Sequence, residues 1–456
     1  MIQTKKITIL SPQGMLGYSY PLESLINGLA YNPDVIAVDA GSTDGGPHRL
    51  GLGIGGVSRY ATKKDLIPLV KAAKERKIPL IIGSSGGSGR NSRVDWLKDI
   101  IHEIAEEEKL SLKVASIYSD LDKDWLKMKV NNQLVKPCGP VPSLTKETID
   151  ESVVIVAQMG VEPFLEALKE KPDIIIAGRA YDPVLFAALP ILKGFDPGLS
   201  LHLGKVLECG AIAASPGTAK DGMIGILYED HFLVTPTNQK RICTPQSVAA
   251  HTLYEKSHPY YLQGPGGMLD LSAATFTKED ERTVRVKGSR FIPSDQYEVK
   301  AEGVKETGYR AVFIAGARDP LFIEQYNIII KQAINDVENY FPMIKEKEAT
   351  LFIKSYGIDG VLGNREFDKS LPKEIGIVAE ATAKSQELAD SIIAYFRSVL
   401  MHLDYPNRIS TSGNLALPFS PPEFSGGKTF EFSIYHLITL DDNDDDIFNI
   451  HIERIG

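Results

Sequence analysis

Short apolar runs alternate with amphipathic segments over the first half of the chain, and this alternation constrains the fold more than any other feature. The runs expected to be strands are ITIL (7–10), DVIAV (34–38), IPLIIG (78–83), KVASIYS (113–119) and DIIIAG (173–178). Apolar residues at helical spacing predict helices at 21–31, 63–77, 92–108, 122–132 and 150–169. Nearly continuous apolar strands between amphipathic helices are typical of a parallel sheet covered on both faces. We therefore predict a doubly wound α/β domain with a mostly parallel sheet over residues 1–215.

The pattern changes beyond Gly217, where strands follow one another without strict alternation. The segments expected to be strands are GMIGILYEDHFLVT, RTVRVKGSRF, YEVKAEGV and YRAVFIAG, with helices at 245–256, 320–341 and 384–402. Strands and helices in separate runs indicate an α+β arrangement. We predict a second, α+β domain over residues 216–456.

Composition excludes several classes of protein. Hydrophobic residues make up 43% and charged residues 24% of the 456 residues, as in an ordinary globular protein. The net charge of -9 disfavours binding to nucleic acid or to anionic membranes. No apolar run reaches the roughly 20 residues that cross a bilayer, and the N-terminal apolar stretch is too short for a signal peptide. Three widely spaced cysteines suit a reducing compartment, so we expect a cytoplasmic protein.

Each of three predicted strands is followed by a polar, glycine-rich loop. These loops are DAGSTDGGPH (39–48), GSSGGSGRNSR (83–93) and GRAYDP (178–183). In an open parallel sheet, ligands bind outside the carboxyl ends of the strands. Turn formation and helix capping explain each loop taken singly. Taken together, the three loops predict one shared ligand site.

The loop at 83–93 has the chemistry of an anion site. Its candidate substrate-binding residues are Gly83, Ser84, Ser85, Gly86, Gly87, Ser88 and Arg90. Bare backbone N–H groups before a helix N-terminus suit a carboxylate or a phosphate. The Gly-Lys-Ser/Thr ending of a Walker A loop is missing, as is the GxGxxG spacing of dinucleotide sites. The sequence therefore indicates no particular cofactor.

The loop at 39–48 supplies candidates for proton transfer. Asp39, Asp44 and His48 are the expected acid–base residues, with Ser42 and Thr43 as substrate-binding neighbours. Asp39 is the strongest candidate because it follows the strand directly. Two other interpretations stay open: Asp39 accepts N–H groups of its own turn, and His48 is simply exposed.

The third loop and the second half of the chain add further candidates. Arg179 can hold a carboxylate with a planar fork, and Asp182 either binds substrate or caps the helix expected at Pro183. Glu208 is a further catalytic candidate, beside a cysteine that is either a nucleophile or a buried apolar residue. Arg318, in ARDP, is a candidate anion-binding residue facing the first domain.

Two segments raise the question of metal binding. His251, Glu255 and His258 share a spacing that would place them on one helix face, but the HExxH pattern is missing and Pro259 ends the helix. Five aspartates in DDNDDD (441–446) indicate a solvated acidic loop rather than a calcium site. We expect no metal site.

A series of motifs follows in order from the N-terminus to about residue 435. They are VDAGSTDGGPHRLG, IIGSSGGSGRN, IIAGRAYDP, GKVLECGAIAA, CTPQSVAAHTLYE, GPGGMLDLSAA, GYRAVFIAGARDP and SGNLALPFSP. Together they resemble the AtuA family, named for acyclic terpene utilisation. The resemblance implies catabolism of citronellol-like terpenoid acids through CoA thioesters, together with a small, separately encoded partner protein. We also expect the chain to form a homo-oligomer.

Two functions of different classes remain open. The first is an enzyme, a lyase or isomerase, that acts on a small carboxylic acid or its acyl-CoA thioester by proton abstraction next to the carbonyl. The second is a non-catalytic ligand-binding or scaffold subunit of a two-component enzyme. A hydrolase is less favoured, because no GxSxG motif occurs at a strand–helix junction.

Overall fold

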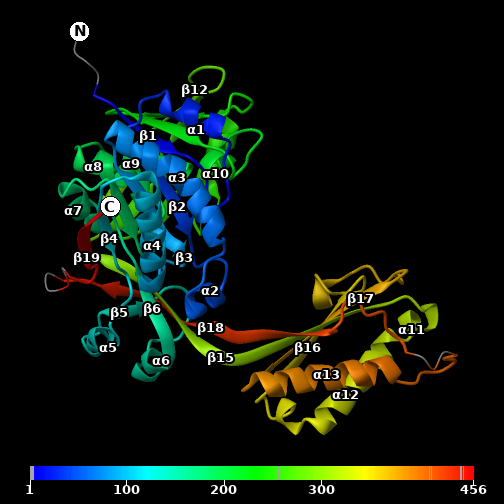
Figure 1. The fold of residues 1–456 in the computed structure, drawn as a ribbon. Coiled ribbons are helices and arrows are strands. Elements are labelled where there is room, and N and C mark those ends of the chain that lie inside the picture. The colour runs from blue at the N-terminus through cyan, green and yellow to red at the C-terminus, as the bar shows by residue number, and fades with distance from the viewer. Residues whose placement is uncertain (1–4, 255–256, 410, 412, 442–443, 445) are drawn as a thin grey trace. The chain divides into compact units, whose positions relative to one another are not determined.

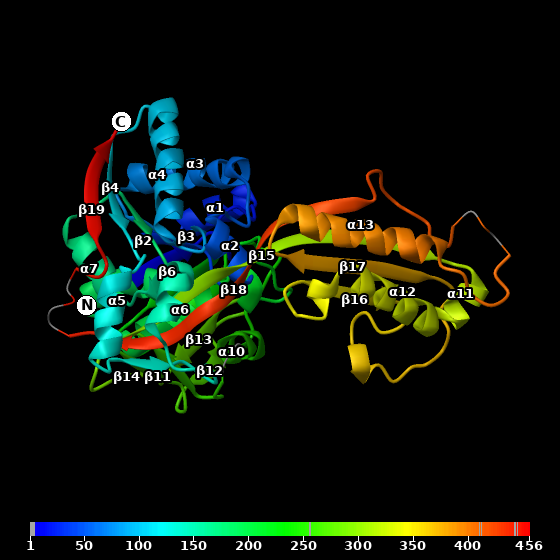
Figure 2. The ribbon, with the colours of Figure 1, turned by 90° about the horizontal axis from the view of Figure 1, so that it is seen from below.

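The computed structural model describes residues 5–254, 257–409, 411, 413–441, 444 and 446–456. The chain is mixed α/β and divides into two compact units (Figures 1 and 2). Unit 1 contains Met1–Lys305 and Phe432–Gly456, and unit 2 contains Glu306–Glu431. Every residue of the candidate site described below, except Arg318, belongs to unit 1.

Unit 1 is built around a ten-stranded sheet. In spatial order its strands are β12 (Thr275–Lys278), β13 (Val284–Lys287), β9 (Phe232–Pro236), β8 (Met223–Leu227), β1 (Ile7–Ser11), β2 (Val35–Gly41), β3 (Leu80–Gly87), β7 (Ile174–Ala177), β4 (Leu112–Ile117) and β19 (Ile450–Ile455). The five strands from β1 to β4 in this order are parallel, and the flanking strands are antiparallel. The sheet is therefore mixed, with a parallel centre.

The predicted boundary after residue 215 lies inside unit 1. Strand β8 pairs antiparallel with β1, and β9 and β13 continue the same sheet. Segments expected in a separate α+β domain thus extend the sheet of the first one.

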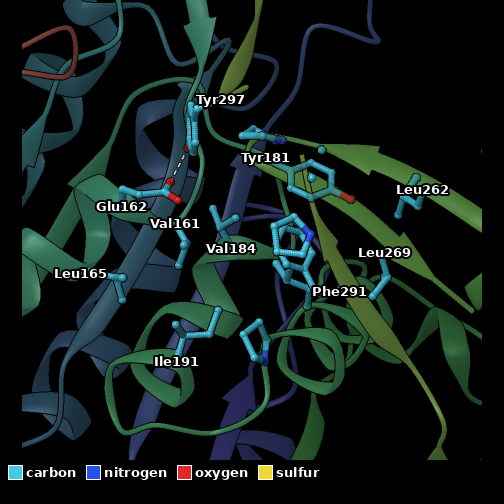
Figure 3. Close-up of a pocket in the computed structure, with 17 residues that line it drawn as sticks. Val161, Glu162, Leu165, Tyr181, Val184, Ile191, Leu262, Leu269, Phe291 and Tyr297 are labelled. Atoms are coloured by element: carbon cyan, nitrogen blue, oxygen red, sulfur yellow. Dashed lines mark hydrogen bonds between the residues drawn. The ribbon is translucent and has the colours of Figure 1, made fainter. Parts of the chain in front are cut away.

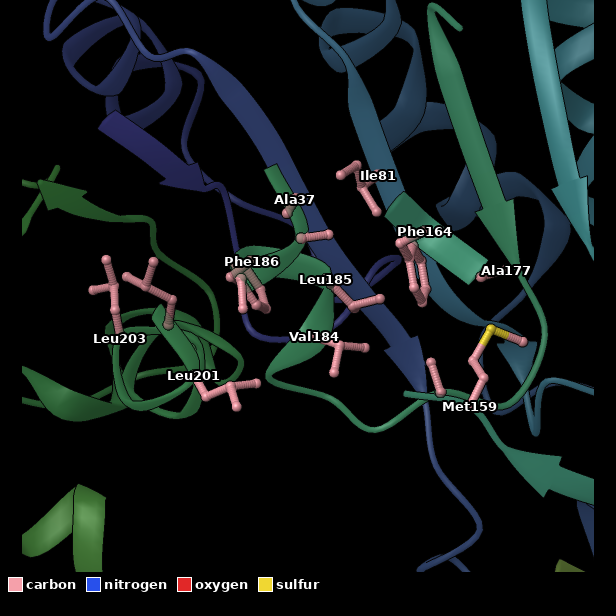
Figure 4. Packing of buried hydrophobic residues seen from close by; sticks show 14 of the residues in the cluster. Ala37, Ile81, Met159, Phe164, Ala177, Val184, Leu185, Phe186, Leu201 and Leu203 are labelled. Carbon is pink, nitrogen blue, oxygen red and sulfur yellow. The ribbon is translucent and has the colours of Figure 1, made fainter. Parts of the chain in front are cut away.

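Helices cover both faces of the parallel centre. The helices of unit 1 are α1 (Leu22–Leu29), α2 (Pro47–Leu52), α3 (Arg59–Arg76), α4 (Asn91–Glu108), α5 (Lys123–Asn131), α6 (Lys146–Glu151), α7 (Glu162–Lys169), α8 (Val184–Leu192), α9 (Pro197–Leu207) and α10 (Pro245–Leu253). Strand β2 shows the two faces, because Ile36 and Val38 pack with residues of α3 and α4, whereas Val35 and Ala37 pack with residues of α7 and α8. Figure 4 shows Ala37 in this second core with Phe164, Leu185 and Phe186.

The helix predicted over 150–169 is wrong. The structure has α6, then the strand β6 (Ser152–Gln158), then α7. The sequence of β6, SVVIVAQ, is rich in β-branched valine and isoleucine, which fit a pleated surface better than a helix. Strand β6 pairs antiparallel with β15 (Glu298–Ala317), a partner far away in sequence.

Two smaller sheets complete the fold. One contains β10 (Tyr261–Gly264), β11 (Gly267–Asp270) and β14 (Arg290–Pro293). The other contains β16 (Thr350–Tyr356), β17 (Ile375–Ala383), β15, β18 (Glu423–Thr439) and β5 (Val135–Pro137), with β6 on β15. Strands β15 and β18 contribute residues to both units.

Unit 2 has its own core. Its helices are α11 (Pro320–Glu324), α12 (Tyr326–Tyr340) and α13 (Gln386–His402). Buried Phe313 and Ile377 of the sheet pack with Ile329 of α12 and Phe396 of α13. Among the helices of the described residues, none combines the length and the apolar character that a membrane span requires.

Candidate functional site

The three glycine-rich loops meet at the carboxyl ends of β2, β3 and β7, which are neighbours in the sheet. A Cβ on Gly41 would lie 2.1 Å from the carbonyl oxygen of Gly87, and a Cβ on Gly89 would lie 2.3 Å from the backbone nitrogen of Arg179. Any side chain at these two positions would collide with the backbone of the neighbouring loop. The glycines therefore serve to bring the loops into contact.

A group of ionic side chains lies where the loops meet, and we call it the charged cluster. Its members are Asp39, Arg179, Asp182, Lys205, Glu208, Lys300 and Glu302. Arg179 Nε donates to Glu302 Oε2 at 2.9 Å, and Arg179 Nη1 lies 3.3 Å from Asp182 Oδ1. Lys300 Nζ lies 2.8 Å from Glu302 Oε1. Burial opposes ionisation of Glu302, but Arg179 and Lys300 lower its pKa to about 2.

Asp39 is a carboxyl of the cluster whose ionisation is disfavoured. It lies near the end of β2, and only 7% of the residue is exposed. Burial raises its pKa well above the usual range, Asp182 and Glu208 raise it further, and Arg179 opposes them in part. Its Oδ1 accepts a hydrogen bond from the backbone nitrogen of Ala40 at 2.9 Å. Asp39 therefore accepts an N–H group of its own turn, as one of its two interpretations expected. It also lies in a central strand of the sheet and has a raised pKa.

The second carboxyl with a raised pKa is Asp182. Burial raises its pKa, and Arg179 and Lys205 lower it in part. The helix α8 begins at Val184 with Pro183 at its N-cap, and no side chain caps it. The capping role considered for Asp182 is therefore wrong, because its side chain turns to Arg179.

Lys205 and Glu208 lie one helical turn apart on the last turn of α9. Lys205 Nζ donates to Glu208 Oε1 at 2.6 Å, in a buried environment. Burial and Glu208 raise the pKa of the neighbouring Cys209 thiol to about 12. A thiol with this pKa is protonated at neutral pH, which disfavours the nucleophile interpretation of Cys209. Its sulfur is only partly buried and lies 3.0 Å from the Tyr254 hydroxyl, so it is not a purely apolar residue either.

The serines of the loop at 83–93 that were predicted to bind substrate, Ser84, Ser85 and Ser88, are fully buried. Ser84 Oγ accepts hydrogen bonds from Arg179 Nη1 at 3.3 Å and from the backbone nitrogen of Ala180 at 3.4 Å. Ser85 Oγ and Ser88 Oγ have no hydrogen-bond partner among the described residues. Of the glycines, Gly83 packs against Leu185, and Gly86 and Gly87 adopt positive φ angles of 61° and 111°.

The rest of the loop at 39–48 divides between the cluster and the surface. Thr43 is buried and donates to Glu302 Oε1 at 3.0 Å. Ser42 donates to the exposed Asp44 at 2.8 Å, and Asp44 acts on the cluster only through its charge near Asp182. His48 is exposed on α2.

Two predicted arginines have other partners. Arg90 lies 3.4 Å from the carbonyl oxygen of Leu50 and 3.2 Å from that of Gly51, so it binds the end of α2. Arg318 belongs to unit 2, is largely exposed and lies 3.7 Å from Glu374. Its neighbour Asp319 caps α11 by accepting from the backbone nitrogen of Leu321 at 2.9 Å.

Gln13 is a member of this region that the sequence analysis missed. It is fully buried after β1, and neither atom of its side-chain amide has a partner among the described residues. Its loop contacts the backbone of Asp39 and packs against Gly210, two residues after Glu208. Leu16 N donates to the Asp39 carbonyl at 2.8 Å, and the Gln13 carbonyl carbon lies 2.8 Å from the Cβ position of Gly210.

An apolar cavity of about 350 Å³ has Tyr181 in its wall (Figure 3). It is lined by Val161, Glu162, Leu165, Tyr181, Val184, Ile191, Pro197, Leu201, Leu262, Gly264, Pro265, Gly266, Gly267, Leu269, Phe291, Pro293 and Tyr297. Tyr181 connects the two regions, because it lines the cavity and stands between Arg179 and Asp182 in the chain. Burial raises its pKa, and so do the charges of Glu208 and Asp182. Tyr181 thus places an apolar cavity next to a group of buried charges.

A family model described as acyclic terpene utilisation family protein AtuA matches residues 59–406. The chain belongs to the AtuA family. This membership indicates a catabolic role. No curated protein and no solved structure matches the chain.

The matched range contains part of the site of this AtuA protein. Arg179, Glu208 and Glu302 lie within it, whereas Gln13 and Asp39 precede it. The GPGG motif forms the turn between β10 and β11 beside the cavity. Its Asp270 binds Arg290 at 2.8 Å across the small sheet.

The residues considered for metal binding have other partners in this AtuA protein. His251 stacks on Tyr254, and burial and Lys205 lower its pKa to about 4. His258 stacks on Tyr261, and Glu255 lies outside the described residues. Within the described ranges, no three His, Cys, Asp or Glu side chains form a set of metal ligands.

The acidic segment near the C-terminus is not simply solvated. Asp444 is buried and pairs with Lys129, whose side chain is 1% exposed. Asp441 Oδ2 lies 3.0 Å from the same ammonium, and Trp125 donates to Asp444 Oδ1 at 2.9 Å. Burial lowers the pKa of Lys129, but the hydrogen bonds to both aspartates raise it overall. We call these four residues the Lys129 cluster; Asp442 and Asp445 lie outside the described residues.

Proposed function

We propose that the chain is a catabolic enzyme that acts on a small carboxylic acid or its CoA thioester by abstracting a proton next to the carbonyl. The reaction is a hydration/dehydration or an isomerisation. The observation that carries the proposal is Asp39, a carboxyl near the end of β2 whose pKa is raised by burial and by two neighbouring carboxylates. A raised pKa makes a carboxylate a stronger base than it is in water, which suits abstraction of a weakly acidic proton.

The neighbours of Asp39 supply the other parts of such a reaction. Arg179 contributes a buried positive charge that stabilises negative charge developing on the substrate carbonyl. The hydroxyls of Ser85 and Ser88, which have no partner among the described residues, are the donors available for the acid or thioester head. Asp182, whose pKa is also raised, is suited to hold the proton that a departing hydroxyl takes up.

The apolar cavity extends this proposal to the rest of the substrate. A head group at the charged cluster would place the substrate tail beside Tyr181, which lines a space walled mainly by aliphatic and aromatic side chains. Removing such a tail from water contributes about 0.8 kcal/mol for each buried methylene group. The combination supports an acid with an aliphatic tail as the substrate.

A second candidate is a non-catalytic ligand-binding or scaffold subunit that presents the ligand to a small partner protein. The pairing within the charged cluster favours this candidate. Nε and Nη1 of Arg179 are already bound to Glu302, Ser84, Ala180 and Asp182, so they are not free to hold a substrate carboxylate.

Hydrogen exchange distinguishes the two candidates. Purified protein, alone and with its partner, is incubated in D₂O with a panel of aliphatic acids and their CoA thioesters. Deuterium uptake next to the carbonyl is then followed by mass spectrometry. The enzyme hypothesis predicts uptake that falls by about a hundredfold or more in Asp39→Asn. The exposed Asp99→Asn on α4 is the matched control and should exchange at the wild-type rate. Binding without exchange would support the scaffold.

A further inference from the structure

The hydroxyl group of Tyr181 differs from those of the other tyrosines whose pKa is raised by burial. Each of the others makes a hydrogen bond to another described residue: Tyr20, Tyr118, Tyr297, Tyr326 and Tyr405. The Tyr181 hydroxyl has no hydrogen bond to any of the residues that the structure describes. Because a tyrosine hydroxyl in such a setting usually has a partner, this one indicates a position for a ligand atom.

The rest of Tyr181 is held in a defined position. Its backbone nitrogen donates to the Met159 carbonyl at 3.0 Å, and its own carbonyl accepts from the backbone nitrogen of Val184 at 3.0 Å. A Cβ on Gly264 of β10 would lie 2.8 Å from Cε1 and 3.1 Å from Cζ of Tyr181, so the ring packs directly against this glycine. Figure 3 shows the ring among the residues that line the apolar cavity. The hydroxyl is therefore a fixed donor at the cavity wall.

The charges around Tyr181 indicate which kind of atom it can bind. Burial and the carboxyl groups of Glu208 and Asp182 raise the pKa of the phenol, so it keeps its proton at neutral pH and remains a donor. The same two carboxyl groups repel an anionic acceptor such as a carboxylate. A neutral carbonyl or hydroxyl oxygen does not meet this repulsion. The position therefore suits an uncharged oxygen atom of a ligand whose apolar part lies in the cavity.

We propose that the Tyr181 hydroxyl binds an uncharged oxygen of the substrate, a carbonyl or a hydroxyl oxygen, where the polar head joins the apolar tail. The inference rests on the proposed function, because it assumes that the substrate head lies at the charged cluster and its tail in the cavity. It adds a residue that selects the substrate. A chain that carries such an oxygen completes the hydrogen bond of Tyr181, whereas a chain without it leaves the hydroxyl unpaired in an apolar setting.

The test uses CoA derivatives that share one medium chain length. They are the acyl thioester, its 3-hydroxy derivative and the S-alkyl thioether, which lacks the carbonyl oxygen. Calorimetry measures their binding to the wild type, Tyr181→Phe and Tyr60→Phe. Tyr181→Phe should bind a probe that carries the recognised oxygen about threefold to tenfold more weakly than the wild type does, because one neutral hydrogen bond is lost. Tyr60, an exposed residue of α3, is the matched control, and Tyr60→Phe should keep the wild-type affinities.

The pattern of losses identifies the oxygen. A loss that both thioesters share and the thioether lacks assigns the carbonyl oxygen to Tyr181. A loss confined to the 3-hydroxy derivative assigns the hydroxyl oxygen and favours hydration/dehydration over isomerisation.

Other outcomes overturn the inference. Unchanged affinities in Tyr181→Phe do so, and so does an equal loss for every probe, because the hydroxyl would then act on the fold or on the CoA moiety. The variant should also keep the wild-type midpoint of chemical denaturation, since a hydroxyl without a partner adds nothing to folding. A lower midpoint, or a variant that does not fold, would show that the protein itself pairs this hydroxyl. All these results leave the proposed function intact. A wild type that binds no probe overturns the acyl thioester as substrate and the inference with it, and the exchange experiment on free acids then decides the proposed function.

Discussion

Two buried groups of charges in unit 1 differ in how completely their polar atoms are paired. In the Lys129 cluster, one ammonium lies between two carboxylates, and both oxygens of Asp444 accept hydrogen bonds. Around the charged cluster, Asp39 has a raised pKa, and the side chains of Gln13, Ser85 and Ser88 are buried without partners among the described residues.

The difference indicates which of the two groups serves stability. A buried polar atom without a partner costs about 1–3 kcal/mol of folding free energy. Proteins break the rule of full pairing mainly at functional sites, where a ligand completes the hydrogen bonds. We therefore interpret the Lys129 cluster as a structural clamp and the charged cluster as a ligand site. Each prediction below changes one member of one group.

The largest effect is expected in the Lys129 cluster. Lys129→Met leaves Asp444 buried without its counter-ion, which should lower the free energy of unfolding by about 3–5 kcal/mol. Chemical denaturation measures this value. Lys127→Met on the same helix removes ion pairs whose carboxylates are exposed, so it should change stability by less than about 1 kcal/mol. Equal losses in the two variants would contradict the clamp.

Arg179→Lys tests how far the charged cluster also contributes to stability. A lysine cannot reproduce the planar contacts of Arg179 with Glu302, Ser84 and Asp182, so stability should fall by about 1–3 kcal/mol. The loss should be smaller than that of Lys129→Met, because a positive charge remains beside Glu302. A variant as stable as the wild type would show that these contacts add nothing to folding and would return Arg179 to the role of a substrate clamp.

Gln13→Met should have the smallest effect and the opposite sign. Methionine has nearly the same shape and removes two buried polar atoms without partners, so the unliganded protein should gain about 1 kcal/mol. The exposed Gln332→Met on α12 should stay within about 0.5 kcal/mol of the wild type. A clear loss of stability in Gln13→Met would mean that the amide is already paired, and would remove Gln13 from the ligand site.

Much of the parallel centre and part of the site could be predicted from the sequence. The apolar runs before Asp39, Gly83 and Gly178 are strands in the structure, and the glycine-rich loops after them meet because parallel strands end at one edge. The same rule applied to the first strand would have found Gln13, which follows β1. The positions of the His48 and Arg90 side chains could not be predicted, because a loop sequence does not reveal which side chains point to solvent or to the end of a helix.

The remainder depends on contacts between distant parts of the chain. Glu302 reaches Arg179 because β15 pairs with β6, a strand whose apolar sequence was interpreted as part of a helix. Lys129 binds aspartates more than three hundred residues away. The apolar cavity is formed by α7, α8 and the small sheet together. These contacts join residues far apart in the sequence, so no local sequence pattern predicts them.

The pH dependence of stability in Asp39→Asn tests the central claim most directly. Folding raises the pKa of Asp39 above its ordinary value of 3.8, so the folded protein binds this proton more tightly than the unfolded chain does. The resulting stabilisation is fully present below the unfolded pKa and is lost as the pH rises through the folded pKa. Asparagine has no such proton. As the pH rises above about 4, the wild type should lose stability that Asp39→Asn keeps. The free energy of unfolding of the variant should therefore exceed that of the wild type at neutral pH. A variant that is less stable than the wild type throughout, with a constant difference, would show that Asp39 is an ordinary turn residue and would contradict the account.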